Sequence, residues 1–192
     1  MSEAELIAQA KRGDREAYET LVRQYDRLAF RTAYVLTGDA GDAEEAAQSA
    51  FLRAFMNLSR FRDDAPFRPW LLKIVVNEAR NKRRSRMRHR RHEVAEEVGL
   101  EWPAPEPGID LQLMARERSA WLADHINALR ESDRAVIHCR YTLDLSELEM
   151  AEVLGCARGT VKSRLSRALE RLRHRLESDP HGYREWTPGE QK

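Results

Sequence analysis

Apolar residues recur at steps of three and four along most of this chain, which is the spacing of helices with one buried face. In the first half, this pattern predicts four helices, over about residues 3–12, 14–36, 42–58 and 66–90. The third is expected to turn its alanines inward together with Phe51, Phe55 and Leu58. No sustained alternation of apolar and polar residues favours a strand, so the pattern predicts an all-α fold.

Capping residues mark several of these predicted helix boundaries. Asp14 stands where its carboxylate can accept from the first backbone N–H groups of the second helix. Asp42 and Glu45 have the spacing of a capping box for the third helix. Pro66 suits the first turn of the fourth helix, where the N–H that proline lacks would have no helical partner.

The second half contains a predicted pair of helices joined by a tight turn. Helical spacing resumes over about 111–129 and 133–141, and Ser146 with Glu149 then forms another capping box. Leu148, Ala151 and Leu154 supply a short apolar face. Gly155 follows, where a left-handed backbone would end the helix at least cost. A longer helix begins after this turn.

That last helix has one apolar side and one basic side. Val161, Leu165, Ala168, Leu169, Leu172 and Leu176 recur at helical spacing. Between Arg158 and Arg175 there are seven Lys or Arg residues and one acid. A short capped helix, a turn and a longer basic helix indicate a helix-turn-helix for the DNA major groove. The alternative is an ordinary helical hairpin with a solvated basic face.

Charge is strongly segregated although the formal net charge of the 192 residues is only +1. Residues 80–91 contain eight Lys or Arg and no acid, whereas residues 93–110 contain six acids, three prolines and no Lys or Arg. The acidic stretch is therefore predicted to be a semi-rigid linker. It separates two small helical domains, at 1–92 and 111–177, and a polar tail at 178–192 is expected to be disordered.

The fourth helix carries an unusual second stripe beside its apolar face. Trp70, Lys73, Asn77, Asn81, Arg84 and Arg88 follow one another at steps of three and four. Cations can track phosphates, a ring can stack on a base and amides can bond base edges, so the stripe favours unpaired nucleic acid. The alternative places Trp70 in the core above a basic helix that is merely well solvated.

Several other classes of protein have little support. No apolar run is long enough to span a bilayer, and the first residues do not resemble a signal peptide. Two cysteines, Cys139 and Cys156, fit a reducing cytoplasm, which is the expected location. No phosphate-binding loop, catalytic constellation or metal-ligand spacing is present, so neither enzymatic activity, nor a cofactor, nor a metal site at His89, His92, His138 and the cysteines is expected.

Four segments in this order resemble the bacterial extracytoplasmic-function (ECF) sigma factors of the sigma-70 family. They are residues 13–22, 42–55, 67–81 and 159–165. The resemblance covers the chain from Leu6 to about Leu176. It implies a sigma2-like four-helix domain that binds core RNA polymerase and captures the −10 element as a single strand. It also implies a sigma4-like helix-turn-helix domain that reads the −35 element as a duplex.

The resemblance also assigns roles to individual residues. Contacts with the polymerase, at the β′ clamp helices, are implied for Asp42, Glu44, Glu45, Gln48, Arg53 and Asn57. Contacts with −10 DNA are implied for Phe61, Arg62, Phe67, Trp70, Lys73, Asn77, Arg80, Asn81, Arg84 and Arg88, with Arg83 on flanking phosphates. Contacts with −35 DNA are implied for Arg158, Thr160, Lys162, Ser163, Arg164, Arg167 and Arg171.

Further partners implied by the resemblance are the polymerase β flap and an anti-sigma factor that covers these surfaces. The chain departs from the family pattern at Ser49, where an acid is usual, at Arg130, where proline is usual, and at Ala157, where a serine cap is usual. A two-domain repressor or activator that acts only on duplex DNA is the rival hypothesis. Such a protein would need neither the Trp70 stripe nor the helix that begins near Asp42.

Overall fold

The computed structural model describes residues 1–89 and 119–179, and throughout these residues the regular structure is helical. In the first part, the helices are α1 (Glu3–Lys11), α2 (Arg15–Thr37), α3 (Ala40–Asn57), the short 3₁₀ turn η1 (Leu58–Arg60) and α4 (Phe67–His89). In the second part, residues 119–127 are helical. They are followed by α6 (Glu131–Ile137), the π-helical turn η3 (His138–Thr142), α7 (Glu147–Leu154) and α8 (Arg158–Glu177). The all-α prediction is confirmed.

Helix ends agree with the capping predictions in most places. The Asp14 carboxylate accepts from the backbone N–H groups of Glu16 and Ala17, and Ser146 and Glu149 form the expected capping box. Gly155 takes φ 65°, in the left-handed region that glycine adopts without strain. The prediction for α3 is wrong, because the cap is Asp39 and its carboxylate accepts from the N–H of Asp42. The helix therefore begins at Ala40, about two residues before the predicted start at Asp42.

The helix predicted over 133–141 is also different in detail. The α-helix begins at Glu131 and ends at Ile137, and one π-helical turn then carries the chain from His138 to Thr142. Pro66 lies immediately before α4, and Pro69 occupies its first turn. The predicted linker 93–110, the tail beyond Asp179 and His92 lie outside the described residues.

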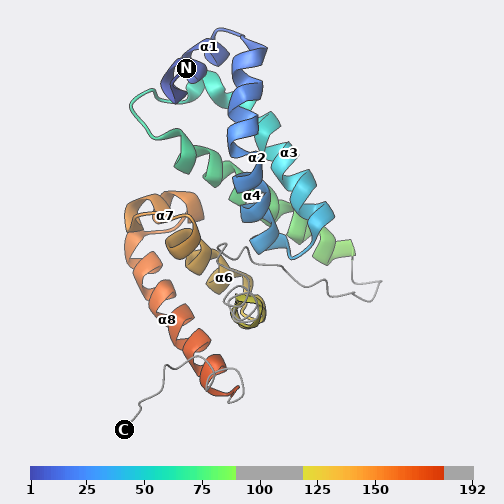
Figure 1. Ribbon diagram of the computed structural model, residues 1–192, viewed down its shortest axis with the longest axis vertical. Coiled ribbons are helices and arrows are strands. Elements are labelled where there is room, and N and C mark those ends of the chain that lie inside the picture. The colour runs from blue at the N-terminus through green and yellow to red at the C-terminus, as the bar shows by residue number, and fades with distance from the viewer. Residues whose placement is uncertain (90–118, 180–192) are drawn as a thin grey trace, which may run out of the picture.

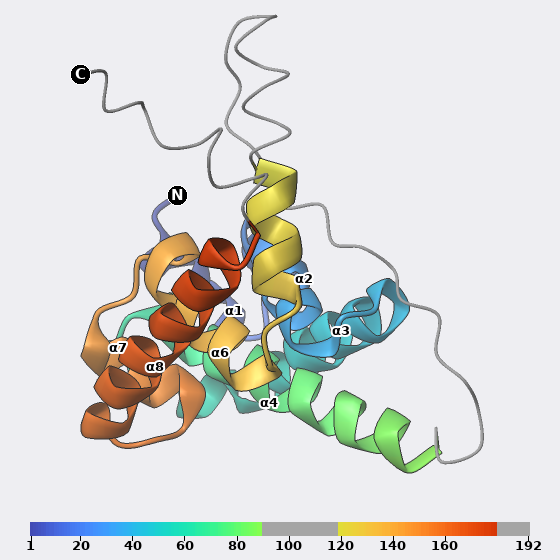
Figure 2. The same ribbon diagram turned by 90° about the horizontal axis from the view of Figure 1, so that it is seen from below.

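The two groups of helices pack against one another. Figure 1 shows α1 to α4 together and α6 to α8 beside them, with the end of α8 pointing away from the first group. Figure 2 shows α7 and α8 on one side and α3 on the other, with α4 and α6 between them. Buried side chains of both groups form one continuous hydrophobic cluster. No helix among the described residues is long and apolar enough to cross a membrane.

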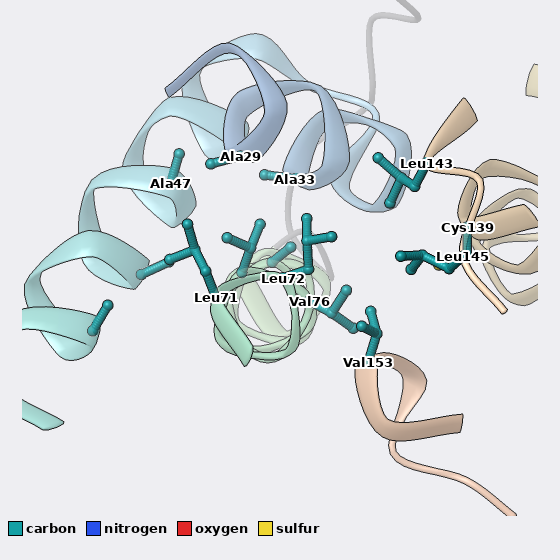
Figure 3. Close-up of a cluster of buried hydrophobic side chains, with 14 of the residues drawn as sticks. Ala29, Ala33, Ala47, Leu71, Leu72, Val76, Cys139, Leu143, Leu145 and Val153 are labelled. Carbon is teal, nitrogen blue, oxygen red and sulfur yellow. The ribbon is translucent and has the colours of Figure 1, made fainter. Parts of the chain in front are cut away.

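Alanines let three helices of the first group approach closely. Ala29 and Ala33 of α2 and Ala47 of α3 point toward Leu71 and Leu72 of α4 (Figure 3), and all five are buried. Small residues on one side and leucines on the other fill the space between the helices. This packing fixes the rotation of α4 about its axis, and so decides where each residue of its basic segment points.

Candidate nucleic-acid interface

The basic segment of α4 divides into three sets of side chains that point in different directions. One set is exposed and consists of Lys73, Asn77, Asn81, Arg84 and Arg88. These residues follow one another at steps of four, four, three and four, so they form a single stripe along the helix. None of them has a side-chain hydrogen bond or ion pair among those seen in the described residues. The stripe is therefore open to a ligand along about four turns of the helix.

A second set turns toward the C-terminal helices. The Arg80 guanidinium donates to the carbonyl oxygen of Leu154 at 2.9 Å, and its Nε lies 3.6 Å from the carboxylate of Glu131. Arg83 donates to the same carboxylate at 2.7 Å. Both arginines were expected to bind DNA phosphates, but here their guanidinium groups bind acceptors of the protein itself.

A third set turns toward the start of α3. Arg86 bridges Asp39 at 2.8 Å and Asp42 at 2.9 Å, and Lys82 is paired with Glu45. The Asp42 N–H and the Arg86 guanidinium lower the pKa of the Asp39 carboxyl, against a smaller opposing effect of burial. Asp42 and Glu45, which were expected to contact polymerase, thus hold α3 and α4 together.

The remaining residues assigned to polymerase contact lie along the outer face of α3. Glu44 and Gln48 are exposed, and Gln48 donates to Glu44 at 3.4 Å. Arg53 forms a 2.7 Å ion pair with Glu78 of α4. Asn57 bonds the carbonyl oxygen of Arg53 at the end of the helix.

Three apolar residues on this outer face were not predicted. Leu52 is 63% exposed, Phe55 is 41% exposed and Met56 is 71% exposed, so the expectation that Phe55 lies inside is wrong. Single exposed apolar residues are common, but three on neighbouring turns of one helix form a patch. The pattern of alanines gave a signal for it, because the buried residues of α3 are all alanines, at positions 43, 46, 47, 50 and 54, and the larger Leu52, Phe55 and Met56 are left outside.

The loop before α4 is built on a cluster of aromatic rings. Phe61 and Phe67 are buried, and their ring centroids lie 5.0 and 5.4 Å from that of Trp70. Lys11 donates to the carbonyl oxygen of Phe61 and pairs with Asp63, both at 2.6 Å, while Arg62 pairs with Asp64. Trp70 is half-buried and packs on the core, as in the alternative interpretation of that residue. The Phe61 and Phe67 rings are buried beneath the loop, so neither ring has a face in contact with solvent.

The first half of α8 exposes the polar residues expected to read the −35 element. Lys162, Ser163 and Arg167 are exposed, and Arg167 donates to the Ser163 carbonyl oxygen at 3.0 Å and to its hydroxyl at 3.2 Å. Thr160 and Arg164 are half-buried. Two others have protein partners, because Arg158 pairs with Glu147 at 3.1 Å and Arg171 pairs with the buried Asp133 at 2.8 Å.

The helix-turn-helix core is formed by residues from both helices. Met150, Val153 and Leu154 of α7 and Val161 and Ala168 of α8 are buried. Leu148, which was expected in this core, is 62% exposed, so that prediction is wrong. Ala157 is the N-cap residue of α8 and offers no side-chain hydrogen bond, as its departure from the family pattern implied.

His138 and Cys139 are buried side chains between the two groups of helices. Burial raises the pKa of the Cys139 thiol to about 12. Burial, with the charges of Arg31 and Arg68, lowers the pKa of His138 to about 4. Among residues 1–89 and 119–179, no three His, Cys, Asp or Glu side chains are arranged to hold a metal ion.

Comparisons with known proteins agree on one family. Residues 21–89 match the family Sigma-70 region 2, and residues 119–172 match the family Sigma-70, region 4. The ECF RNA polymerase sigma factor SigW of Bacillus subtilis is 31% identical over an alignment that covers 88% of this chain and 94% of that protein. The ECF RNA polymerase sigma-E factor of Escherichia coli K12 is 30% identical over an alignment that covers 90% of this chain and 93% of that protein.

A solved structure is also similar over most of the chain. The sigma factor RpoE of Bartonella quintana, in complex with the anti-sigma factor NepR, gives a TM-score of 0.68 at 26% identity. The similarity covers 84% of this chain and 98% of that one.

Proposed function

This chain belongs to the ECF RNA polymerase sigma factors of the sigma-70 family, and on that premise we propose how its surfaces share the recognition of a promoter. The exposed stripe on α4 binds the −10 element as a single strand. The first half of α8 reads the −35 element as a duplex. The outer face of α3 binds core RNA polymerase. The protein then acts by binding alone, and its specificity is that of the two DNA surfaces.

The exposed stripe on α4 is the observation that carries the proposal. Asn77 and Asn81 can donate to and accept from base edges, and Lys73, Arg84 and Arg88 can follow the phosphates on either side. A regulator that binds only duplex DNA through α8 has no use for a second basic helix, α4, that carries two exposed amides and belongs to the other domain. Base stacking on Phe61 or Phe67 is not part of the proposal, because both rings are buried.

Because of the apolar patch, we propose that binding to polymerase depends more on burial of apolar side chains than on charge pairing. Leu52, Phe55 and Met56 can provide the apolar centre of an interface, with Glu44, Gln48 and Arg53 around it. Leu52→Ala or Met56→Ala should therefore weaken binding to core polymerase more than Glu44→Ala does. The RpoE relative was solved with an anti-sigma factor, and we propose that a protein of this kind also controls the present chain.

The test of the proposal is transcription by the purified chain with core RNA polymerase. Promoter fragments are first selected from a genomic library by the reconstituted holoenzyme. Asn77→Ala is then compared with wild type for run-off transcription, for strand opening by permanganate reactivity, and for binding of the closed duplex.

We expect Asn77→Ala to lose strand opening while duplex binding stays at the wild-type level. The matched control is Glu19→Gln, an exposed substitution on α2 whose side chain is 65% accessible, and it should leave all three readouts unchanged. If the reconstituted holoenzyme transcribes none of the templates, the proposal as a whole is overturned. Unchanged opening by Asn77→Ala would overturn the assignment of the stripe.

A further inference from the structure

The last turn of α1 carries a lysine that reaches across to the loop before α4. Figure 1 shows α1 beside the turn that follows α3, where this loop begins. Three buried apolar residues hold α1 against its neighbours, namely Leu6, Ile7 and Ala10. Lys11 lies four residues after Ile7, so it leaves the helix on the same side. Its ammonium group donates to the carbonyl oxygen of Phe61 and to the carboxylate of Asp63, both at 2.6 Å.

The ammonium group of Lys11 is largely shielded from water. The side chain is 19% exposed, and the nitrogen lies 5.5 Å from the centre of the buried Phe61 ring. An ammonium group in such a place loses part of its hydration, and this cost is offset where protein acceptors replace the water. The Phe61 carbonyl oxygen and the Asp63 carboxylate are these acceptors. Lys11 therefore ties both the beginning of the loop and its exposed part to α1.

Further bonds hold the loop of residues 61–66 in one shape. The N–H of Ala65 donates to the carbonyl oxygen of Arg62 at 3.1 Å, and the Arg62 guanidinium pairs with Asp64 through two bonds of 3.0 and 2.6 Å. The buried rings of Phe61 and Phe67 anchor the two ends. The side chains of Arg62 and Asp64 are exposed, so donors and acceptors in fixed positions face the solvent. A ligand that binds to such a preformed surface does not have to order it first.

This loop lies at the start of the exposed stripe on α4. The rings of Phe61 and Phe67 contact Trp70, which lies three residues before Lys73, the first residue of the stripe. Residues three apart in a helix are neighbours on its surface. A strand that follows the stripe beyond Lys73 therefore reaches Trp70 and then the loop. The base at that end of the strand meets the exposed donors and acceptors of the loop.

We propose that Lys11 is a positioning residue, which holds the loop of residues 61–66 in the shape that selects the base at one end of the captured strand. The inference rests on the proposed function of α4, and it adds a residue of α1 that lies outside the proposed DNA surfaces. Lys11 acts through the loop, because its ammonium group is bonded to Phe61 and Asp63. Without this group, the loop keeps its two aromatic anchors but its exposed groups lose their fixed positions. The preference for one base at that end then falls, while the bases along the stripe are bound as before.

Lys11→Met in the full chain is the direct test, because methionine keeps most of the apolar stem of the lysine and removes the donor. The variant is reconstituted with core RNA polymerase. Fluorescent single strands carry the −10 element of the promoters selected above, and each position of the element is replaced in turn by the other bases. Competition binding then gives the base preference at every position.

We expect Lys11→Met to lower the preference at one end position of the strand about tenfold, which is the size of a lost base-edge contact, and to leave the other positions unchanged. Asn77→Ala should instead lower the preference at an interior position. The matched control is Arg23→Met, which removes an exposed cation from the neighbouring helix α2 and should leave every preference unchanged.

Asp63→Asn is a second, milder variant that weakens one of the two bonds and leaves Lys11 in place. The side chain of Asp63 is 78% exposed, so this substitution does not disturb the core. It should lower the same end preference by a smaller factor. The two substitutions together should have no more effect on that preference than Lys11→Met alone, because both act through one contact.

The outcomes separate the inference from the proposed function. If Lys11→Met changes no preference, or weakens binding of all strands by one common factor, then Lys11 only supports the fold and the inference is overturned. A wild-type preference confined to interior positions also overturns it. If circular dichroism shows that Lys11→Met has lost helix, Asp63→Asn decides, and an unchanged end preference in that variant overturns the inference. If the wild-type holoenzyme binds no strand or prefers no base at any position, the proposed role of α4 fails instead.

Discussion

Asp133 of α6 and Arg171 of α8 form a 2.8 Å ion pair in which the carboxylate is almost completely buried. The Nε of Arg130 lies 3.3 Å from the same carboxylate oxygen, Oδ2. Arg171 was expected on −35 DNA, but its guanidinium is committed to fixing the angle between α6 and the second half of α8. The residues of α8 that we propose to read DNA therefore lie in its first half, and its second half anchors the helix.

Replacement of Asp133 should reveal this structural role. Asp133→Asn leaves Arg171 without its anionic partner, and we expect the free energy of unfolding to fall by about 1–3 kcal/mol, less than for a fully buried pair because Arg171 is partly exposed. Chemical denaturation measures this loss. Glu177→Gln, which removes the acid of an exposed pair with Arg173, is the control and should leave stability unchanged. Equal stability of Asp133→Asn and wild type would refute the anchoring role.

His138 makes stability depend on pH. Burial and the nearby charges of Arg31 and Arg68 lower its pKa from 6.5 to about 4, and its Nε2 lies 3.2 Å from the Thr32 hydroxyl. The folded chain thus holds this histidine neutral, whereas the unfolded chain protonates it below about pH 6.5. The contribution of His138 to the free energy of unfolding is therefore fully present above about pH 6.5. It falls as the pH decreases toward 4, by about 1.4 kcal/mol per pH unit within this window. Below about pH 4 the contribution is constant.

Denaturation between pH 7 and 5 measures this dependence. His138→Gln should reduce the slope in that range, because the glutamine does not titrate. Asp39 and Glu149 do not interfere, since hydrogen bonds lower the pKa of both carboxyl groups and they titrate at more acidic pH. Identical slopes in wild type and His138→Gln would mean that the histidine is charged in the folded protein.

The two cysteines should react at very different rates. Cys139 is 1% exposed and burial raises the pKa of its thiol to about 12, so little thiolate forms there at neutral pH. Cys156 is half-buried at the turn between α7 and α8. With Ellman's reagent at pH 8 we expect one fast thiol, which Cys156→Ser removes and Cys139→Ser retains. Rapid modification of both thiols in the folded wild type would contradict this difference in reactivity.

Local signals account for what could be predicted from the sequence. Asp14, Ser146 and Gly155 act within one turn of their own positions, so their roles could be inferred without knowledge of the fold. The capping box proposed at Asp42 was wrong because Asp39, three residues earlier, is a competing cap. Both choices satisfy the same local rule, and only the turn after α2 decides between them.

The rest of the site depends on packing between distant segments. Leu148 and Phe55 are apolar and exposed, and an amphipathic pattern cannot distinguish a side chain that faces the core from one that faces a partner. The division of the basic segment into three sets depends on residues as far along the chain as Glu131 and Leu154. Charge and spacing predicted a nucleic-acid surface on α4, but they could not show which arginines are already paired with other groups of the protein.

The missing side-chain cap of α8 offers a way to stabilise the C-terminal helices. Ala157 has the extended backbone of an N-cap residue, with φ −65° and ψ 147°, but no side-chain acceptor. Ala157→Ser should add a hydrogen bond to the first turn of α8 and raise the free energy of unfolding by about 1 kcal/mol. Ser146→Ala is the reciprocal variant and should cost a similar amount by removing the cap of α7. If Ala157→Ser is no more stable than wild type, the first turn already has another acceptor.

Arg167 should contribute to discrimination between −35 sequences rather than to overall affinity for DNA. Its guanidinium is exposed, and within residues 1–89 and 119–179 it bonds Ser163 of its own helix alone, by bonds that a base edge can replace. We expect Arg167→Ala to lower the preference for the selected −35 duplex over a scrambled one by about 1–3 kcal/mol. Arg173→Ala is the matched control, since it removes another exposed cation from the second half of the same helix. It should change affinity for both duplexes by the same factor. Equal effects of the two substitutions on discrimination would show that Arg167 contacts phosphate only.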